Sequence, residues 1–173
     1  SLLNICLEKK YAGKTEFIKE EFYLCREMTK RNILKSENDP FIDPALIRNM
    51  ALSAIQNREF DWLNELLKNK ADELQPDIRS NLYNLINAAI FFEKKEFSAS
   101  LELLSKIKDK GDQLKINIYS LKLKLYYELN DYEEMKFTED SFRHYIKNSK
   151  YISQRTKTFN SDFLKIYTGI THI

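Results

Sequence analysis

The sequence has very few of the residues that make tight turns, with only 3 glycines and 3 prolines among 173 residues. So few glycines leave little backbone for cradling a phosphate group, and the chain has no GxxxxGK phosphate loop, GxSxG turn or HExxH motif. Its carboxylates lie in runs such as KEE and YEE, which are typical of solvated helix faces. We therefore expect no catalytic residues and no cofactor, and we predict that the chain is not an enzyme.

Residues that ligate metals are equally rare. The two cysteines, Cys6 and Cys25, lie in apolar, helix-like surroundings and not in a CxxC motif, so we expect reduced, structural thiols. The two histidines, His144 and His172, have no cysteine or carboxylate partner at ligand spacing. The sequence therefore predicts no metal site.

Long apolar runs and a marked excess of charge are also missing. No stretch approaches the roughly 18 apolar residues of a membrane span, and the start SLLNICLEKK lacks the order of a signal peptide. We expect a cytoplasmic protein with no membrane partner. The formal charge of +2 is too close to neutral for the electrostatic footprint of a nucleic-acid-binding domain. The length favours a single domain over residues 1–173, and a start without Met in helix-like sequence indicates the C-terminal part of a longer protein.

What the sequence does contain is a repeated junction. NREFDWLNELL, residues 57–67, and KKEFSASLELL, residues 94–104, share Glu-Phe and Glu-Leu-Leu at the same places, and related acid–aromatic pairs occur in KTEF, 14–17, and LNDYEE, 129–134. The aromatic residues are 43, 37 and 35 positions apart, in the range of helix-pair repeats. They are Phe17, Phe60, Phe97 and Tyr132, each preceded by an acid: Glu16, Glu59, Glu96 and Asp131. We interpret each junction as a turn between antiparallel helices, in which the acid caps the second helix and the ring fills the corner.

The flanking segments carry helix signals. Asp43 is predicted as an N-cap before Pro44, and Pro76 is predicted to open a further helix. That helix has two apolar stripes, which predicts that it lies between neighbours on both sides. One stripe is Ile78, Leu82, Leu85, Ala89 and Phe92, and the other is Tyr83, Ile86 and Ile90. Trp62, the single tryptophan, is predicted to pack inside the protein rather than to anchor a partner.

Residues 114–125 fit two interpretations, because LKINI and LKLKL alternate as a half-buried strand would. The same window also fits the helical period, and we predict a helix with one face formed by Leu114, Ile118, Leu121 and Leu125 and another by Ile116, Tyr119, Leu123 and Tyr126. A last helix within residues 153–170 has Phe159, Phe163, Ile166 and Ile170 at helical spacing and Gly169 as its expected end. We predict that it caps the preceding helices.

The junctions resemble those of the tetratricopeptide repeat, whose helix pairs carry a small residue in the first helix and an aromatic residue at the turn. Ala51 and Ala88 stand nine residues before Phe60 and Phe97, at the family's small position, whereas Leu123 stands nine residues before Tyr132. The chain is similar over nearly its whole length to the C-terminal parts of uncharacterised bacterial tetratricopeptide-like proteins. The resemblance implies an all-α fold: a right-handed α-solenoid of about four antiparallel helix pairs plus a C-terminal capping helix.

In that family the first helix of each pair lines a concave surface. The resemblance therefore implies a partner-binding groove with an apolar centre and charged rims, formed by Arg48, Leu52, Gln56, Phe92, Glu93, Asn117, Lys124, Tyr127 and Glu128. Such a groove suits a peptide or an amphipathic helix. We predict a non-catalytic protein-interaction or scaffold module, and a purely architectural role stays open beside it.

A second candidate site is the basic segment 141–161, which contains no acidic residue. Its cations are Arg143, Lys147, Lys150, Arg155 and Lys157, and aromatic residues lie between them. Basic and aromatic residues together suit nucleic acid, so the alternative function is an RNA- or DNA-contacting helical repeat. The competing interpretation is that these cations complement the dipole of a helix ending near Asn148. Because the overall charge is low, we rank a nucleic-acid partner below a protein or peptide.

Overall fold

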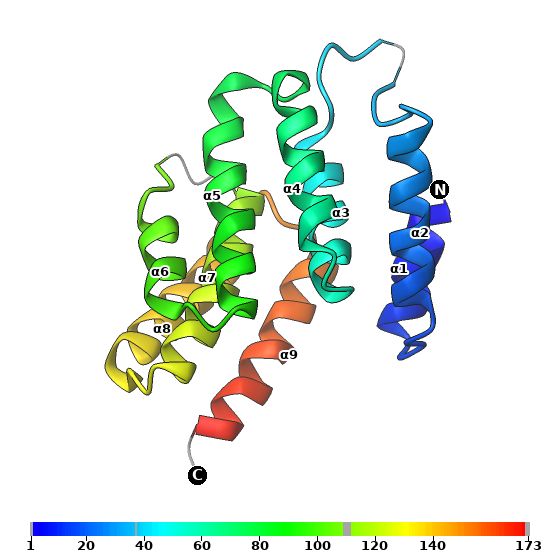
Figure 1. Cartoon of the computed structure of the whole chain (residues 1–173). Helices are drawn as coiled ribbons and strands as arrows, with labels where there is room; N and C mark the ends of the chain where they lie inside the picture. Colours follow the sequence, from blue (N-terminus) through cyan, green and yellow to red (C-terminus); the bar gives the residue numbers. More distant parts are fainter. Residues whose placement is uncertain (1, 37, 109–111, 172–173) are drawn as a thin grey trace.

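The computed structural model describes residues 2–36, 38–108 and 112–171, and within these residues it is all-helical (Figure 1). The α-helices are α1 (Leu2–Tyr11), α2 (Phe17–Lys30), α3 (Pro44–Gln56), α4 (Phe60–Asn69), α5 (Pro76–Glu93), α6 (Phe97–Ser105), α7 (Asp112–Glu128), α8 (Tyr132–Asn148) and α9 (Gln154–Thr171), with a 3₁₀ turn η1 (Ala71–Glu73) after α4. The all-α prediction is confirmed. Since α7 covers residues 114–125, the helical interpretation of that segment is confirmed as well.

The repeated sequence junction is also a repeat of backbone conformation. Each junction aromatic is the first residue of a helix, namely α2, α4, α6 or α8. At the last three junctions the residue two places earlier lies in the left-handed region: Arg58 at φ 59°, Lys95 at φ 63° and Asn130 at φ 56°. At the third junction the N–H of Lys95 donates to Phe92 O at 2.9 Å and that of Glu96 to Phe91 O at 2.8 Å, and equivalent bonds close the other two. This is the Schellman arrangement that ends helices.

The predicted roles of the acid and the ring at each junction are only partly correct. Asp131 accepts the N–H of Glu134 at 3.2 Å, but the other three junction acids, Glu16, Glu59 and Glu96, make no side-chain cap hydrogen bond in the described chain. Short side chains such as that of Asp suit the N-cap geometry, whereas glutamate is not among the favoured N-cap residues. The rings of Phe17, Phe60 and Phe97 are half-buried, while Tyr132 is 54% exposed. The other predicted cap is confirmed, since Asp43 accepts the N–H of Ala45 at 2.8 Å, with Pro44 opening α3.

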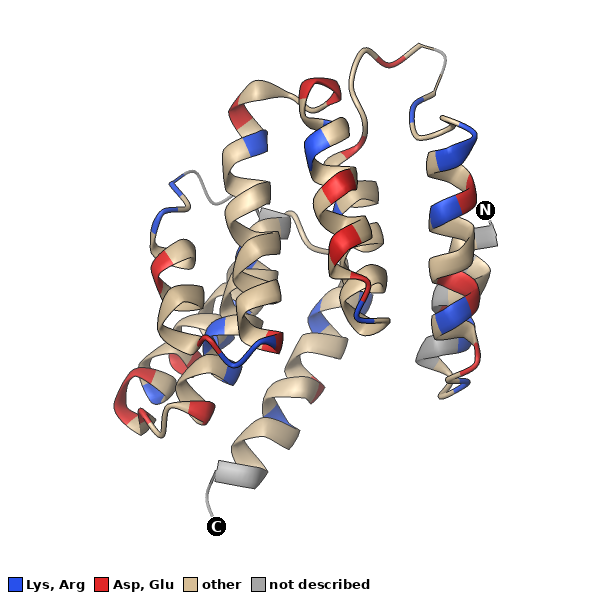
Figure 2. Ribbon diagram, viewed as in Figure 1, with Lys and Arg blue, Asp and Glu red and all other residues tan. Residues whose placement is uncertain are grey.

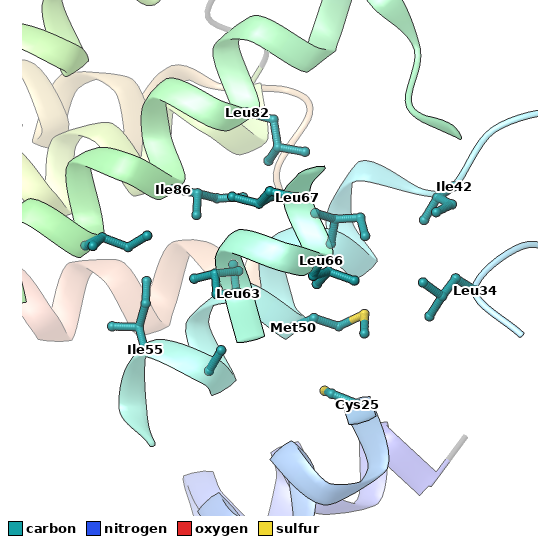
Figure 3. Close-up of a cluster of buried hydrophobic side chains, with 14 of the residues drawn as sticks. Cys25, Leu34, Ile42, Met50, Ile55, Leu63, Leu66, Leu67, Leu82 and Ile86 are labelled. Atoms are coloured by element: carbon teal, nitrogen blue, oxygen red, sulfur yellow. The ribbon is translucent and has the colours of Figure 1, made fainter. Parts of the chain in front are cut away.

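The buried side chains form three clusters that follow one another along the chain. The first joins α2, α3, α4 and α5 and includes Cys25, Met50, Leu63 and Leu82 (Figure 3). The second joins α5, α6 and α7, and the third joins α7, α8 and α9. Trp62 packs against the first cluster with its ring 5.0 Å from that of Phe22, in an edge-on arrangement, as predicted for a packing residue.

Two helices, α5 and α7, each contribute to two clusters because they are apolar on two sides. The two predicted faces of α7 are confirmed: one belongs to the second cluster and the other to the third. The predicted division of α5 is wrong, because only Leu85, Ala88 and Phe92 join the second cluster. The first cluster takes Ile78, Leu82, Tyr83, Ile86, Ala89 and Ile90. The helical period sets the direction in which each side chain leaves α5. The packing of α3 against α5 decides which of these side chains belong to the first cluster and which to the second.

The helices pack mainly on neighbours in the sequence. Consecutive helices contact one another in most cases, and α3 contacts α5 while α5 contacts α7. Figure 1 shows the result: α1 and α2 lie at one end of the molecule and α7 and α8 at the other.

Helix α9 packs on α8, but of the predicted side chains only Phe163 is among those packed against the third cluster. Leu164 is 1% exposed in the third cluster, and Phe163 and Tyr167 pack beside it. By contrast Phe159 is 59% and Ile166 is 67% exposed, while the side chain of Ile170 lies outside the described residues. The helix also continues through Gly169 to Thr171. Its sequence carries two overlapping apolar stripes, and the surface offered by α7 and α8 selects the one that contains Leu164.

Candidate functional site

The described residues contain no group of three or more His, Cys, Asp and Glu side chains arranged to hold a metal ion. None of their helices has the length and apolar character that crossing a membrane requires. His144 is exposed, with its Nε2 atom 3.1 Å from the side-chain nitrogen of Asn148, and His172 lies outside the described residues. Cys6 and Cys25 are buried free thiols. Three surface hollows of the described chain contain residues that the sequence predicts for a site, and they are the candidates.

One hollow, which we call the α3–α9 cleft, has a volume of about 990 Å³. One part of its wall is formed by α3 and α7, another by the segment 151–153 and the first two turns of α9, and Glu8 of α1 adds a carboxylate. Three of the predicted groove residues, Arg48, Leu52 and Asn117, line it together. In Figure 1, α9 (orange to red) begins near the lower end of α3 and runs downward, with α7 and α8 to its left.

The α3–α9 cleft combines exposed apolar side chains with hydrogen-bond donors. Leu52 is 41% exposed, Phe159 59% and Tyr151 84%, and all three line the cleft. The guanidinium groups of Arg48 and Arg155 come from α3 and α9. The walls also carry the amides of Asn49, Asn117 and Asn160. Apolar area together with a few oriented polar groups is typical of a site that binds a peptide or a helix.

The other predicted groove residues do not line this cleft. The ring of Phe92 lies 5.7 Å from that of Phe97 and packs against the second cluster, while Tyr127 lies 6.0 Å from the ring of Tyr167 in α9. The remaining four, Gln56, Glu93, Lys124 and Glu128, are exposed elsewhere on α3, α5 and α7. The spacing rule chose residues by their place in each helix, and it had no information on where α9 would lie.

Sequence reasoning missed Tyr151, Phe159 and Asn160 as lining residues of this cleft. The sequence places Tyr151 and Phe159 among the aromatic residues of the basic segment, and Phe159 also in the apolar stripe of the last helix. Asn160 is 5% exposed, and its side-chain nitrogen donates to Thr156 O at 2.8 Å. No local pattern could have found these residues, because they face Leu52 only through the docking of α9.

The structure divides the five cations of the basic segment among three hollows. Arg155 lines the α3–α9 cleft, while Lys150 lines a hollow of about 720 Å³ beside Tyr119, Tyr145 and Tyr151. The other three, Arg143, Lys147 and Lys157, line a hollow of about 440 Å³ between α8 and α9. Figure 2 shows Lys and Arg spread over many helices and interspersed with Asp and Glu. The segment is therefore not one continuous basic face.

A hydrogen-bonded group of side chains ties α9 to α8. Arg143 donates from Nε and Nη2 to Glu139 Oε1 at 2.8 and 2.7 Å, and the hydroxyl oxygen of Thr168 lies 2.9 Å from the same carboxylate oxygen. Burial disfavours the charged form of Glu139, but the hydrogen bonds from Arg143 and Thr168 together outweigh it, so the pKa of this carboxyl is lowered. Glu139 is thus ionised at neutral pH. The hydroxyl of Tyr167 also donates to the carbonyl of Leu123 on α7.

Comparisons with protein families, curated proteins and solved structures find no match for this chain. The tetratricopeptide resemblance therefore stays a prediction.

Proposed function

We propose that the chain is a non-catalytic interaction module that binds a peptide or an amphipathic helix of a partner protein in the α3–α9 cleft. The observation that carries this proposal is the convergence of Arg48, Leu52 and Asn117 in one cleft of about 990 Å³. These residues come from two helices that the sequence predicted to line a common groove. The apolar side chains of the cleft offer burial, and its arginine and amide groups offer hydrogen bonds to a peptide.

The proposal includes a right-handed α-solenoid architecture, in which α1–α2, α3–α4, α5–α6 and α7–α8 are antiparallel pairs and α9 covers α8. Two observations support it. The same left-handed turn closes the first helix at three junctions, and packing runs mainly between near neighbours in the sequence. In repeat proteins of this kind each unit contacts chiefly the next, and the surface side chains can vary without disturbing the core.

Binding of RNA or DNA by the basic segment is the second candidate. It is favoured by the hollow in which three cations meet, and it is ranked second because the other two cations line different hollows. A nucleic-acid backbone is best met by a continuous basic surface.

The test is a selection of peptides from a random display library on the immobilised protein, followed by fluorescence anisotropy with the selected peptides. We expect Leu52→Arg to weaken their binding by tenfold or more, because it places a charge among the apolar side chains of the cleft. Phe137→Arg is the matched control, since Phe137 is 69% exposed on α8 and does not line the cleft. Circular dichroism should show equal helix content for the two variants.

Equal loss of peptide binding in both variants would contradict the proposal, and so would a selection that yields no binding peptide. The same variants should be tested with mixed RNA at two salt concentrations. RNA binding that falls steeply with salt and is lost on reversing Lys147 and Lys150 to Glu would favour the second candidate.

A further inference from the structure

The hollow between α8 and α9, which we call the α8–α9 cleft, differs in chemistry from the α3–α9 cleft. Its volume is about 440 Å³. Arg143 and Lys147 face it from α8, and Lys157 and Ser161 face it from α9. Its floor includes Leu164, which is buried in the third cluster. With Gln154, also from α9, two polar side chains of α8 and three of α9 surround one cleft.

The charge of the α8–α9 cleft is strongly one-sided. Three cations line it and no carboxylate does. Arg143 is paired with Glu139, which neutralises one of the three charges and leaves a surplus of two. No ion pair of Lys147 or Lys157 is present in the described part of the chain, whereas Lys70, Lys106 and Lys165 each meet a carboxylate at 2.7 or 2.8 Å. Like charges gathered in one cleft repel one another unless an anion lies between them.

Hydrogen bonds between the two helices position Lys157 and Arg143. Lys157 Nζ lies 3.5 Å from the carbonyl oxygen of Lys147, which brings the cation of α9 to the end of α8. Arg143 Nη2 donates to Thr168 Oγ1 at 2.8 Å in addition to its bonds to Glu139, so three hydrogen bonds orient the guanidinium group. These bonds use Nε and Nη2, and Nη1 takes part in none of them. An arginine held in this way is prepared for an oxyanion, because little freedom is lost when the anion binds.

From this convergence we propose that the α8–α9 cleft binds a phosphate-type oxyanion, either inorganic phosphate or the phosphate group of a small monoester. A phosphate dianion matches the surplus of two positive charges, and its oxygens can accept hydrogen bonds from ammonium, guanidinium and hydroxyl donors together. The competing explanation is that Lys147 and Lys157 only complement the negative end of the α8 dipole. That role needs no ligand, so the two explanations differ in whether phosphate has an effect.

The test compares the intact chain with Lys147→Gln/Lys157→Gln by isothermal titration calorimetry and by thermal unfolding. The probes are inorganic phosphate and glycerol phosphate, with sodium chloride at equal ionic strength as the salt control. The matched control variant is Lys30→Gln/Lys68→Gln, because these exposed lysines lie in the last turns of α2 and α4. It removes the same charge and a comparable interaction with helix ends, but outside the cleft.

We expect saturable phosphate binding and a rise in unfolding temperature for the intact chain and for the control variant. The cleft variant should bind on the order of tenfold more weakly or worse, because charged hydrogen bonds are lost. Binding of glycerol phosphate but not of inorganic phosphate would support the proposal and identify a monoester as the ligand.

Two results would overturn the proposal. One is a phosphate effect no larger than that of chloride, which would leave only the dipole role. The other is equal weakening in the cleft and control variants, which would mean that the phosphate responds to overall charge. If a short RNA binds through Lys147 and Lys157 while neither small phosphate does, the proposal fails in favour of nucleic acid.

Discussion

The left-handed residues at the repeated junctions allow a quantitative test of the turn. Arg58 and Lys95 have φ values of 59° and 63°, and both side chains are exposed. A residue with a Cβ atom pays roughly 1–2 kcal/mol in this region. Glycine avoids that strain, but it loses about 0.5–1 kcal/mol more backbone freedom on folding. Arg58→Gly and Lys95→Gly should therefore each stabilise the protein by about 0.5–1 kcal/mol.

The two substitutions should add, because they lie in different junctions without shared partners. Both substitutions keep the backbone N–H that closes the turn: the N–H of residue 58 donates to Ile55 O at 3.0 Å, and that of residue 95 donates to Phe92 O at 2.9 Å. We expect about 1–2 kcal/mol for the double variant, and a rise in unfolding temperature of roughly 2–4 °C per kcal/mol for a chain of this length. Urea unfolding followed by circular dichroism gives the free energy directly.

The control is Lys94→Gly, one residue before Lys95, because φ at Lys94 is −81° and glycine relieves no strain there. It should destabilise the protein, both through the freedom of glycine and through loss of the Lys94 ammonium that lies 5.8 Å from the centre of the Phe60 ring. If Arg58→Gly and Lys95→Gly are as destabilising as Lys94→Gly, the common turn does not exist in solution, and the repeated junction loses its structural meaning.

Three further measurements test the packing and the buried polar groups. Phe142→Ala should lower the free energy of unfolding in urea titrations by about 3–5 kcal/mol, since the ring is 0% exposed and stacks on that of Tyr119 at 5.1 Å. Tyr132→Ala should cost under about 1 kcal/mol, because Tyr132 is half-exposed. Similar losses in the two variants would refute the assignment of Phe142 to the core. The pKa of Glu139 is lower in the folded chain than in the unfolded chain, where it is about 4.3. Ionised Glu139 therefore stabilises the fold fully at pH values above about 4.3, and this stabilisation is lost as the pH falls through the folded-state pKa. Glu139→Gln should therefore cost about 1–3 kcal/mol at pH 7 and reduce the loss of stability on acidification, and an unchanged acid profile would show that the group of side chains around Glu139 is not formed. Burial also raises the pKa values of Tyr83, Tyr126 and Tyr167. The unfolded chain ionises these tyrosines near pH 10 and the folded chain only at higher pH, so the free energy of unfolding should fall above about pH 10 while tyrosinate absorbance keeps rising. Complete tyrosine titration near pH 10 without unfolding would contradict the burial of these three side chains.

The sequence alone determined where most of the helices begin and where the junctions between them lie. Pro44 and Pro76 open α3 and α5 as predicted, and each junction aromatic opens a helix. The two faces of α7 could also be predicted, despite the alternation that resembles a strand. These features depend on interactions between residues that are only a few positions apart, such as i to i+4 hydrogen bonds, N-caps and the residues closing a turn. Local sequence carries the whole of that information.

Only the tertiary structure decided how the faces of α5 and α9 are buried and which side chains meet in the clefts. Helical spacing allowed α9 to dock through either of two stripes, and the surface formed by Leu123, Phe142 and Ile146 selected the one with Leu164. That docking brought Phe159 to the cleft of Leu52 and Lys157 to the end of α8. The packing of α5 on α6 and α7 placed Phe92 against the second cluster. The helical period fixes the angle at which a side chain leaves its helix. The neighbour that it meets depends on packing summed over residues up to about a hundred positions apart, and no short window of the sequence contains that sum.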